Sequence, residues 1–352
     1  MSETKDNAQT QLVEAVKAAL SHVSQEREKE IISRRFGLYD RKETLEQIGD
    51  MLGITRERVR QLEKAILVRL RLLAADGQMP LVAAAEKMII THLSEMGRAA
   101  RMQDLADHLI GRLASATEKS HVAFLAELTP TITIINENDD FYQAAAIDTV
   151  GDEKSVKKQI TDIAKAIKAH GEPITAEQLH AKLSYEHPSH IAALASMSKK
   201  LAELKGNWGL VSWPTVNPKT IRDKIFVILD DRGKPMHFSD IAKAIKDSDF
   251  KRKNVTTQAI HNELIKDKRF VLIGRGIYAL NTWGYSSGTV AETIAEVLKK
   301  AGQPLHRDEI VKQVMSSRQV KETTVLLNLQ SKPQFQRVAK ATYIFADPSQ
   351  PQ

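Results

Sequence analysis

Apolar residues recur along the chain at three- and four-residue spacing, and this pattern predicts mainly helical structure. Four glycines anchor one degenerate pattern: Gly97, Gly171, Gly233 and Gly302. An isoleucine stands eight residues before each glycine, and a leucine or isoleucine stands four before and eight after it. The glycines are 74, 62 and 69 residues apart, so each copy has the size of a small domain. A repeat of this kind predicts four tandem domains that are built alike.

One copy of the repeat predicts three helices followed by two strands. The first helix ends at the glycine, which tolerates the left-handed backbone, and a short connection follows that contains proline in three copies. The third helix is clearest in "NVTTQAIHNELIKD", residues 254–267, and "RFVLIGRGIYAL" then predicts a hairpin with Gly274 and Gly276 at the turn. Helix–helix–helix–hairpin is the layout of the winged helix. We therefore predict a mainly α fold with small β wings, in which four winged helices are arranged in tandem.

The chain before the first repeat follows a different pattern. The helical segment "REKEIISRRFGL" precedes "TLEQIGDML", for which Thr44 is a suitable N-cap. Gly53 ends that second helix, and Thr55 caps a third that runs from Arg56 to about Leu73. Two helices joined by a short turn with glycine predict a helix-turn-helix, whose second helix enters the major groove of DNA.

The third of these helices has an apolar and a charged side. Val59, Leu62 and Ile66 lie on one side. The opposite side carries Arg56, Glu57, Arg60 and Gln61. Arginine suits the acceptors of guanine, glutamine suits adenine, and glutamate can accept from cytosine. The charged side is therefore expected to read DNA; an ordinary solvated face is the alternative.

The segment "EREKEIISRRFGLYDRKETLEQIGDMLGITRERVRQLEKAILVRLR" resembles the fourth conserved region of primary bacterial sigma factors, with "TRERVRQLEKA" as its most specific part. The resemblance implies that this helix reads a −35-type promoter element and that the domain docks on the flap of the RNA polymerase beta subunit. By position, it assigns base edges and adjacent phosphates to Arg56, Glu57, Arg60 and Gln61. It assigns mainly the DNA backbone to Arg58 and Lys64.

A second resemblance concerns the repeats. "GKPMHFSDIAKAI" and "GRGIYALNTWGY" in the third copy are similar to the HARE-type winged helix, which occurs in the delta subunit of bacterial RNA polymerase and in DNA-modifying systems. "GQPLHRDEIVKQV" and "FQRVAKATYIF" in the fourth copy resemble it nearly as well. The first two copies keep the glycine-anchored pattern and differ in the wing.

These patterns predict five domains. They are a sigma region-4-like helix-turn-helix (1–79), an acidic winged helix (80–150), a second winged helix (151–213), a basic HARE-like third (214–287) and a HARE-like fourth (288–352). The formal charge is −5 in the first winged helix and +6 in the third. We expect the first to bind protein or act as a spacer, because its charge repels DNA. The role of the second and fourth copies is left open.

The basic third copy is the best candidate for a second nucleic-acid site. Three residues precede its recognition helix: Lys251, Arg252 and Lys253. Three more stand at the start of that helix: Thr256, Thr257 and Gln258. Arg275 lies at the tip of the wing. An ordinary solvated loop and wing is an equally weighted alternative.

Other chemistry is not indicated. The chain has 352 residues, a net charge of +7 and no cysteine, which excludes disulfides and cysteine zinc sites and suits a reducing cytosol. No apolar run reaches the roughly 20 residues of a membrane span. His187 and His190 in "HPSH" suggest a surface loop rather than a metal pair, and no nucleotide-binding loop or catalytic triad emerges. We expect no catalysis, no cofactor, no metal and a cytoplasmic, nucleoid-associated protein.

The leading hypothesis is a bacterial, sequence-specific DNA-binding transcription regulator that binds promoter-like duplex DNA and contacts RNA polymerase. We do not expect a free-standing sigma factor, because the aromatic-rich region that melts promoter DNA has no counterpart here. Two alternatives remain open. One is a delta-like polymerase accessory subunit that reads little DNA; the other is an architectural protein that binds DNA without sequence preference.

Overall fold

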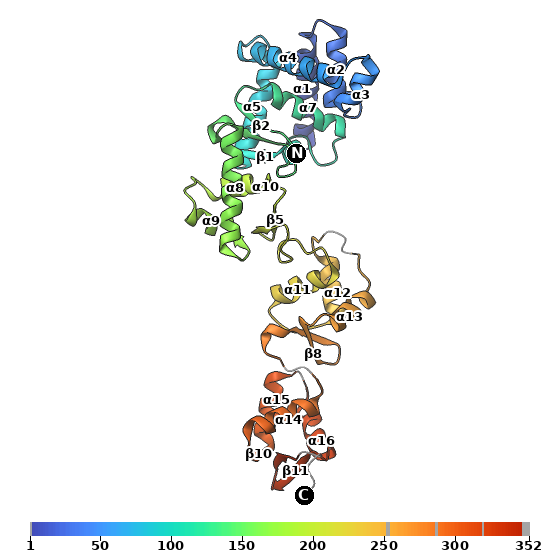
Figure 1. Ribbon diagram of the computed structural model, residues 1–352, viewed down its shortest axis with the longest axis vertical. Helices are drawn as coiled ribbons and strands as arrows, with labels where there is room; N and C mark the ends of the chain where they lie inside the picture. The colour runs from blue at the N-terminus through green and yellow to red at the C-terminus, as the bar shows by residue number, and fades with distance from the viewer. Residues whose placement is uncertain (1, 251–253, 286–287, 319, 347–352) are drawn as a thin grey trace. The chain divides into compact units, whose positions relative to one another are not determined.

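A computed structural model describes residues 2–250, 254–285, 288–318 and 320–346, which form helices and small antiparallel sheets (Figure 1). The chain divides into two compact units, residues 1–216 and 217–352. The prediction of a mainly α fold with small β elements is confirmed. The five domain boundaries stay predictions.

Four helices open the first unit. They are α1 (Ser2–Ser21), α2 (Glu26–Phe36), α3 (Leu45–Leu52) and α4 (Arg56–Ala75). The apolar pattern predicted α2, α3 and α4, and Gly37 ends α2 in the left-handed conformation. It gave no account of α1. Helices α3 and α4, with the short turn between them, form a helix-turn-helix.

The first two repeats complete this unit. The first contains α5 (Pro80–Glu95), β1 (Ala99–Arg101), α6 (Met102–Ile110), α7 (Ala116–Leu128), β2 (Ile132–Ile135) and β3 (Ala144–Ile147), followed by a 3-10 turn, η1 (Asp148–Val150). The second contains α8 (Glu153–His170), β4 (Ile174–Thr175), α9 (Ala176–Lys182), α10 (Pro188–Ser196), β5 (Leu201–Leu204) and β6 (Asn207–Leu210).

The other two repeats form the second unit. The third contains α11 (Ile221–Arg232), β7 (Met236–His237), α12 (Phe238–Asp247), α13 (Thr257–Lys266), β8 (Phe270–Gly274) and β9 (Ile277–Leu280), with a 3-10 turn, η2 (Asn281–Trp283), after it. The fourth contains α14 (Val290–Ala301), β10 (Leu305–His306), α15 (Arg307–Ser317), α16 (Glu322–Ser331), β11 (Phe335–Ala339) and β12 (Thr342–Phe345).

All four repeats share one order of elements and one sheet topology. Each runs helix, strand, helix, helix, strand, strand, and each sheet is antiparallel with its third strand in the middle: β1-β3-β2, β4-β6-β5, β7-β9-β8 and β10-β12-β11. The first strand was not predicted. It lies in the connection that contains proline and pairs with the third strand, for example Ile174 with Trp208. A strand of two or three residues is too short to show an alternating pattern.

The residues that define the repeat have the expected positions. The four glycines all have positive φ: Gly97 (89°), Gly171 (83°), Gly233 (60°) and Gly302 (62°). The isoleucines eight residues before them are fully buried: Ile89, Ile163, Ile225 and Ile294. The repeat therefore reflects the packing of the first helix of each copy on its own core.

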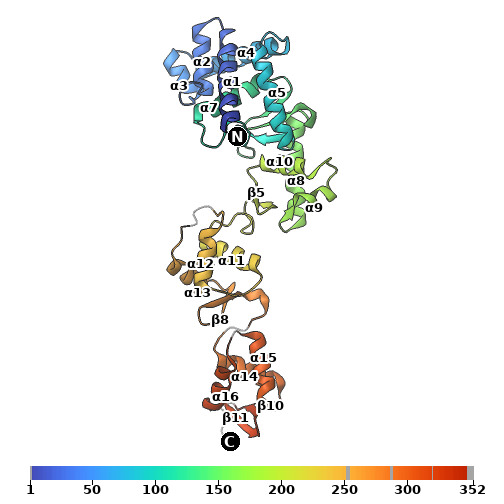
Figure 2. The ribbon, with the colours of Figure 1, turned by 180° about the vertical axis from the view of Figure 1, so that it is seen from behind.

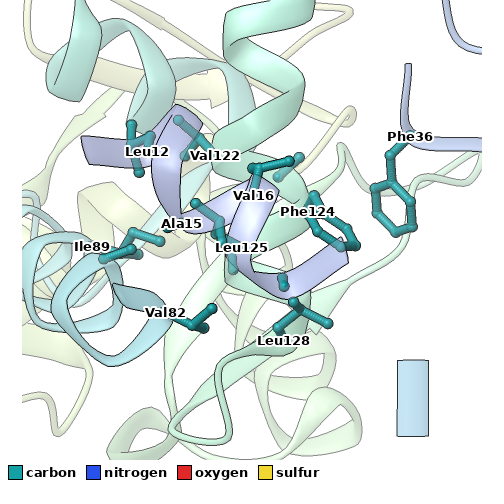
Figure 3. Packing of buried hydrophobic residues seen from close by; sticks show 14 of the residues in the cluster. Leu12, Ala15, Val16, Phe36, Val82, Ile89, Val122, Phe124, Leu125 and Leu128 are labelled. Atoms are coloured by element: carbon teal, nitrogen blue, oxygen red, sulfur yellow. The ribbon is translucent and has the colours of Figure 1, made fainter. Parts of the chain in front are cut away.

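One hydrophobic cluster joins the N-terminal helices to the first repeat and extends from Leu12 to Ile147. Helix α1 runs beside α5 and α7 in both views (Figure 1 and Figure 2). Its apolar side chains meet those of both helices, and Phe36 of α2 packs edge-on against Phe124 of α7 at 5.1 Å between ring centroids (Figure 3). The helix-turn-helix is thus held on the first repeat by a shared core.

The first two repeats are also joined by close contacts. Arg101 of β1 donates to the carbonyl of Ser196 in α10, and the Tyr142 amide donates to the Met197 carbonyl at 2.9 Å. Gly97 lies so close to α10 that a Cβ built on it would be 2.5 Å from the Ser189 carbonyl oxygen. The glycine therefore serves both the helix end and the contact between repeats.

Candidate nucleic-acid interface

Three local features set the direction of α4. Thr44 caps α3, its hydroxyl accepting from the Gln47 amide while the Gln47 side chain accepts from the Thr44 amide. Gly53 then ends α3 in the left-handed conformation, at φ +64°. Thr55 caps α4 by accepting from the Arg58 amide at 3.2 Å. The expected caps and turn are therefore confirmed.

The inner face of α4 is fixed by a small core of its own. Ile31, Ile48 and Val59 are completely buried against one another, one from each of α2, α3 and α4. Gly49 permits the close approach of the turn, because a Cβ built there would be 2.7 Å from the Ile54 carbonyl oxygen. The start of α4 is consequently held firmly while its other face remains open.

All six predicted residues of α4 are exposed: Arg56, Glu57, Arg58, Arg60, Gln61 and Lys64. Four of them form a network along the outer face. Arg60 binds Glu57 through two hydrogen bonds of 2.8 and 2.6 Å, and Gln61 donates to the same carboxylate at 3.3 Å. The Arg58 guanidinium donates to the side-chain oxygen Oε1 of Gln61 at 3.4 Å. The side chains are thus ordered by one another and remain accessible to a ligand.

The Glu57 carboxylate is the centre of this network. Its hydrogen bonds from Arg60, with a smaller contribution from Gln61, lower its pKa from 4.5 to about 2. Glu57 is therefore ionised at neutral pH. The face then presents four cations and one anion, and it combines guanidinium donors with a carboxylate acceptor.

The second half of α4 uses its charges differently. Arg69 pairs with Glu28 of α2 at 2.6 Å, and Arg71 pairs with Glu127 of α7. These two arginines tie α4 to its neighbours. The basic residues of this helix therefore divide into an exposed set near its start and a structural set near its end.

Arg35 was missed by the sequence analysis. It lines a hollow of about 340 Å³ with Thr44, Leu45, Glu46 and Arg56, at the N-terminal end of α3. Its guanidinium also binds Glu63 at 3.1 Å. Arg35 and Arg56 thus lie together at the start of a helix, and helix N-termini are places where phosphate groups bind. In the sequence, only the capping pattern around Thr44 indicated that a helix start lies at this place.

The third repeat places its predicted residues on two elements. Thr256 is the N-cap of α13, and its hydroxyl accepts from the Ala259 amide at 3.2 Å. The helix therefore begins three residues later than predicted. Thr257 and Gln258 are exposed on its first turn, and Arg275 is exposed between β8 and β9. Lys251, Arg252 and Lys253 lie outside the described residues.

The loop predicted for "HPSH" was wrong. His187 is the N-cap of α10, its Nδ1 accepting from the Ser189 amide at 3.1 Å, and Pro188 occupies the first helical position. Proline suits that position because its fixed φ matches the helix and no amide is lost. His237 and His306 cap α12 and α15 in the same way.

Comparison with known proteins supports the class of the N-terminal part. The geometry defines a helix-turn-helix with an exposed polar recognition face. Residues 20–72 match the family model described as Sigma-70, region 4. Residues 20–72 therefore resemble sigma-70 region 4, a class of domain that binds DNA and interacts with RNA polymerase.

Three of the matching relatives, all sigma factors, illustrate the similarity. The principal sigma factor HrdC of Streptomyces coelicolor is 56% identical over 46 residues, which are 13% of this chain and 14% of HrdC. SigA4 of Synechococcus elongatus is 41% identical over 68 residues, 19% of this chain and 22% of SigA4. The sigma factor sigB of Arabidopsis thaliana is 50% identical over 46 residues, 13% of this chain and 8% of sigB. The similarity thus spans less than a quarter of each of these relatives.

Among the residues that the structure describes, no helix has both the length and the apolar character needed to cross a lipid bilayer.

Proposed function

We propose that this protein is a transcription regulator that reads a promoter-like element in duplex DNA through α4. The observation that carries the proposal is the exposed, mutually ordered set of polar side chains on the first turns of α4, opposite the apolar face that packs on the core. A recognition helix needs an exposed polar face to contact base edges and a packed apolar face that fixes the helix on its domain.

Each side chain of this set has a role in the proposal. Arg60 and Gln61 contact base edges, since their donors match guanine and adenine. Glu57 holds both in position through the hydrogen bonds described above. Arg58 and Lys64 contact the DNA backbone. Arg56 adds a phosphate contact at the hollow it shares with Arg35.

A contact with RNA polymerase belongs to the same proposal. Val68 and Leu72 are 45% and 61% exposed, one turn apart on the second half of α4. Exposed apolar side chains at this spacing suit a helix-in-groove contact, and the beta flap is the partner that the sigma resemblance implies. Leu72→Glu should abolish capture of core polymerase from nuclease-treated extract, whereas Leu113→Glu, at another exposed leucine, should not. Equal capture by both variants would remove this contact from the proposal.

The repeats enter the proposal as winged-helix domains, the third and fourth of HARE type. Their shared order of elements and sheet topology supports this assignment. The third repeat supplies a second, weaker DNA contact through Thr257, Gln258 and Arg275, with Thr256 positioning the helix that carries the first two. The acidic first repeat binds protein or acts as a spacer. The protein has no catalytic activity and works in the cytoplasm at the nucleoid.

The proposal is tested by selecting bound sequences from a random duplex library with the full chain. Arg60→Ala and Gln61→Ala should each weaken binding to the selected duplex by about 1–3 kcal/mol and relax the preference at one position. Lys165→Ala is the matched control, because Lys165 is exposed on α8 and forms a similar ion pair with Asp162 at 3.3 Å.

Two outcomes would favour other functions. A double variant of Arg60 and Gln61 that binds the selected site as tightly as the natural chain would end the reading-helix proposal. Capture of core polymerase without duplex binding would favour an accessory subunit, which the acidic first repeat also suits. Binding with steep salt dependence and no preferred sequence would indicate an architectural protein.

A further inference from the structure

Two histidines and a glutamate converge on neighbouring helices of the first repeat. His92 and Glu95 lie on α5, and His108 lies on α6. The Glu95 Oε2 atom is 3.5 Å from His92 Nδ1 and 3.3 Å from His108 Nε2. The two imidazole rings meet edge to face, with their centroids 5.0 Å apart. The DNA-binding proposal makes no use of these residues.

The backbone positions of the three residues are fixed by the core beneath them. Ile89 and Leu93 of α5 pack with Leu105 and Leu109 of α6, and all four are buried. His92 and Glu95 are three residues apart and therefore lie on one face of α5. His108 reaches the same place from α6. The cluster is consequently a product of helix packing and does not depend on a mobile loop.

The distances agree with those of a tetrahedral metal site. Zinc binds histidine nitrogen and carboxylate oxygen at about 2.0–2.2 Å, so two such ligands stand about 3.3–3.6 Å apart. The separations of Glu95 from the two histidines fall in this range, and all three ligand atoms lie within 4.8 Å of one another. A metal ion would therefore fit without movement of the helices.

Asp104 is placed to complete the set. It lies one turn before His108 on α6, lines one hollow with His92 and His108, and lines an adjoining hollow with Glu95. Its carboxylate is 50% exposed, and Arg101 Nε is 3.9 Å away. We expect a change of rotamer to bring its carboxylate towards the other three groups.

We propose that His92, Glu95 and His108 bind a divalent ion of the zinc type, with Asp104 as fourth ligand. Two imidazoles with carboxylates suit zinc and the late first-row metals better than magnesium or calcium. The side chains of Glu95 and His108 are 56% and 44% exposed, so an ion can enter from solvent. The negative charge of this repeat favours a cation. The ion would link α5 to α6.

The test uses the full chain without a histidine tag, after treatment with a chelator. Zinc chloride titrated in a calorimeter should bind at this site with one ion per chain. Cobalt chloride should give the visible absorption of four-coordinate Co(II). Glu95→Gln and His108→Ala should each weaken zinc binding by at least about tenfold. Asp104→Asn should shift the Co(II) spectrum towards higher coordination by water.

The control is the double variant His187→Ala/His190→Ala, which removes another close histidine pair of the same unit, at 6.3 Å between ring centroids. It should bind zinc as the natural chain does. Zinc should raise the unfolding temperature of the natural chain and of the control by more than it raises that of Glu95→Gln, which separates metal loss from misfolding.

Equal zinc affinity in the natural chain, Glu95→Gln and His108→Ala would overturn the site. Failure of the natural chain to bind zinc would also overturn it, and the cluster would then be an ion pair between Glu95 and the histidines. An unchanged Co(II) spectrum in Asp104→Asn would overturn the assignment of the fourth ligand. None of these results depends on whether the protein binds DNA.

Discussion

Among the residues of α4, one carboxylate determines where its neighbours lie. Glu57 accepts from both Arg60 and Gln61, so the two side chains assigned to base edges are held by a third group of the same face. The spacing of three and four residues permits this network. An arginine and a glutamine held in place lose less conformational freedom when they bind a base pair.

The pKa of Glu57 provides a direct test of the network. Arg60 lowers this pKa to about 2, so Arg60→Ala should return it towards 4.5. Because the folded-state pKa is depressed, the stabilisation from this pair is complete above the unfolded-state value and is lost as pH falls through about 2. The pKa of Glu57 in the natural chain and in Arg60→Ala can be measured by NMR, from the chemical shift of its carboxyl carbon over acidic pH. The same titration midpoint in the natural chain and in the variant would show that the pair does not form in solution.

The exposed positions of α4 could be predicted because the apolar stripe of a helix also fixes its polar side. The pairing of Glu57 with Arg60 was not predicted, although residues three apart in a helix lie on the same side and can form an ion pair. The cluster of His92, Glu95 and His108 could not be predicted, because α5 and α6 are separate in sequence and only their packing brings the three residues together. Contact with DNA itself stays a prediction.

At the level of single elements, we expect the N-cap of α4 to affect DNA binding as well as helix stability. Thr55→Ala removes the acceptor of the Arg58 amide and should cost about 1 kcal/mol. The first turn should then fray, so amide exchange should quicken at residues 56–58 and binding to the selected duplex should weaken. Thr55→Ser keeps the hydroxyl and serves as control. Alanine and serine variants that exchange alike would contradict this role.

Gly97 and Gly233 hold the same position in two repeats but differ in their surroundings. A Cβ at Gly97 would strike the Ser189 carbonyl oxygen, whereas nothing lies within 4 Å of one at Gly233. Gly233→Ala should therefore cost only the left-handed backbone penalty of about 1 kcal/mol. Gly97→Ala should cost more and should also speed amide exchange in α10. Calorimetry and hydrogen exchange on the full chain measure both, and equal penalties would argue against the close contact.

The repeat was visible in the sequence because buried isoleucines and helix-ending glycines recur at fixed offsets. The short first strands were not visible, since pairing with a distant strand creates them. The start of α10 was predicted wrongly because proline breaks a helix when it lies in the interior but is well suited to the first position. Pro188 occupies that first position. Local signals thus predicted most of the helices, whereas contacts between elements determine the short strands.

For the whole molecule, two different contributions to DNA binding are expected. Gln61→Ala should change which sequences are preferred. Arg275→Glu, in the turn between β8 and β9, should weaken binding to all duplexes alike. The plot of the logarithm of the binding constant against the logarithm of the salt concentration should become less steep, by about the contribution of one phosphate contact. Arg232→Glu, on α11 of the same repeat, is the control for the change in charge. Affinities over a range of salt concentrations test this, and a sequence-dependent effect of Arg275→Glu would contradict it.

The core shared by α1, the helix-turn-helix and the first repeat has a practical consequence for protein engineering. A fragment cut to residues 20–72 would lose Leu12, Ala15 and Val16 and would leave Ile66 and Leu70 without their covering partners. Such a fragment should precipitate or need a carrier, even though it holds every side chain assigned to base pairs. Transplanting the reading surface to a new scaffold would require the leading helix and the adjoining repeat as well.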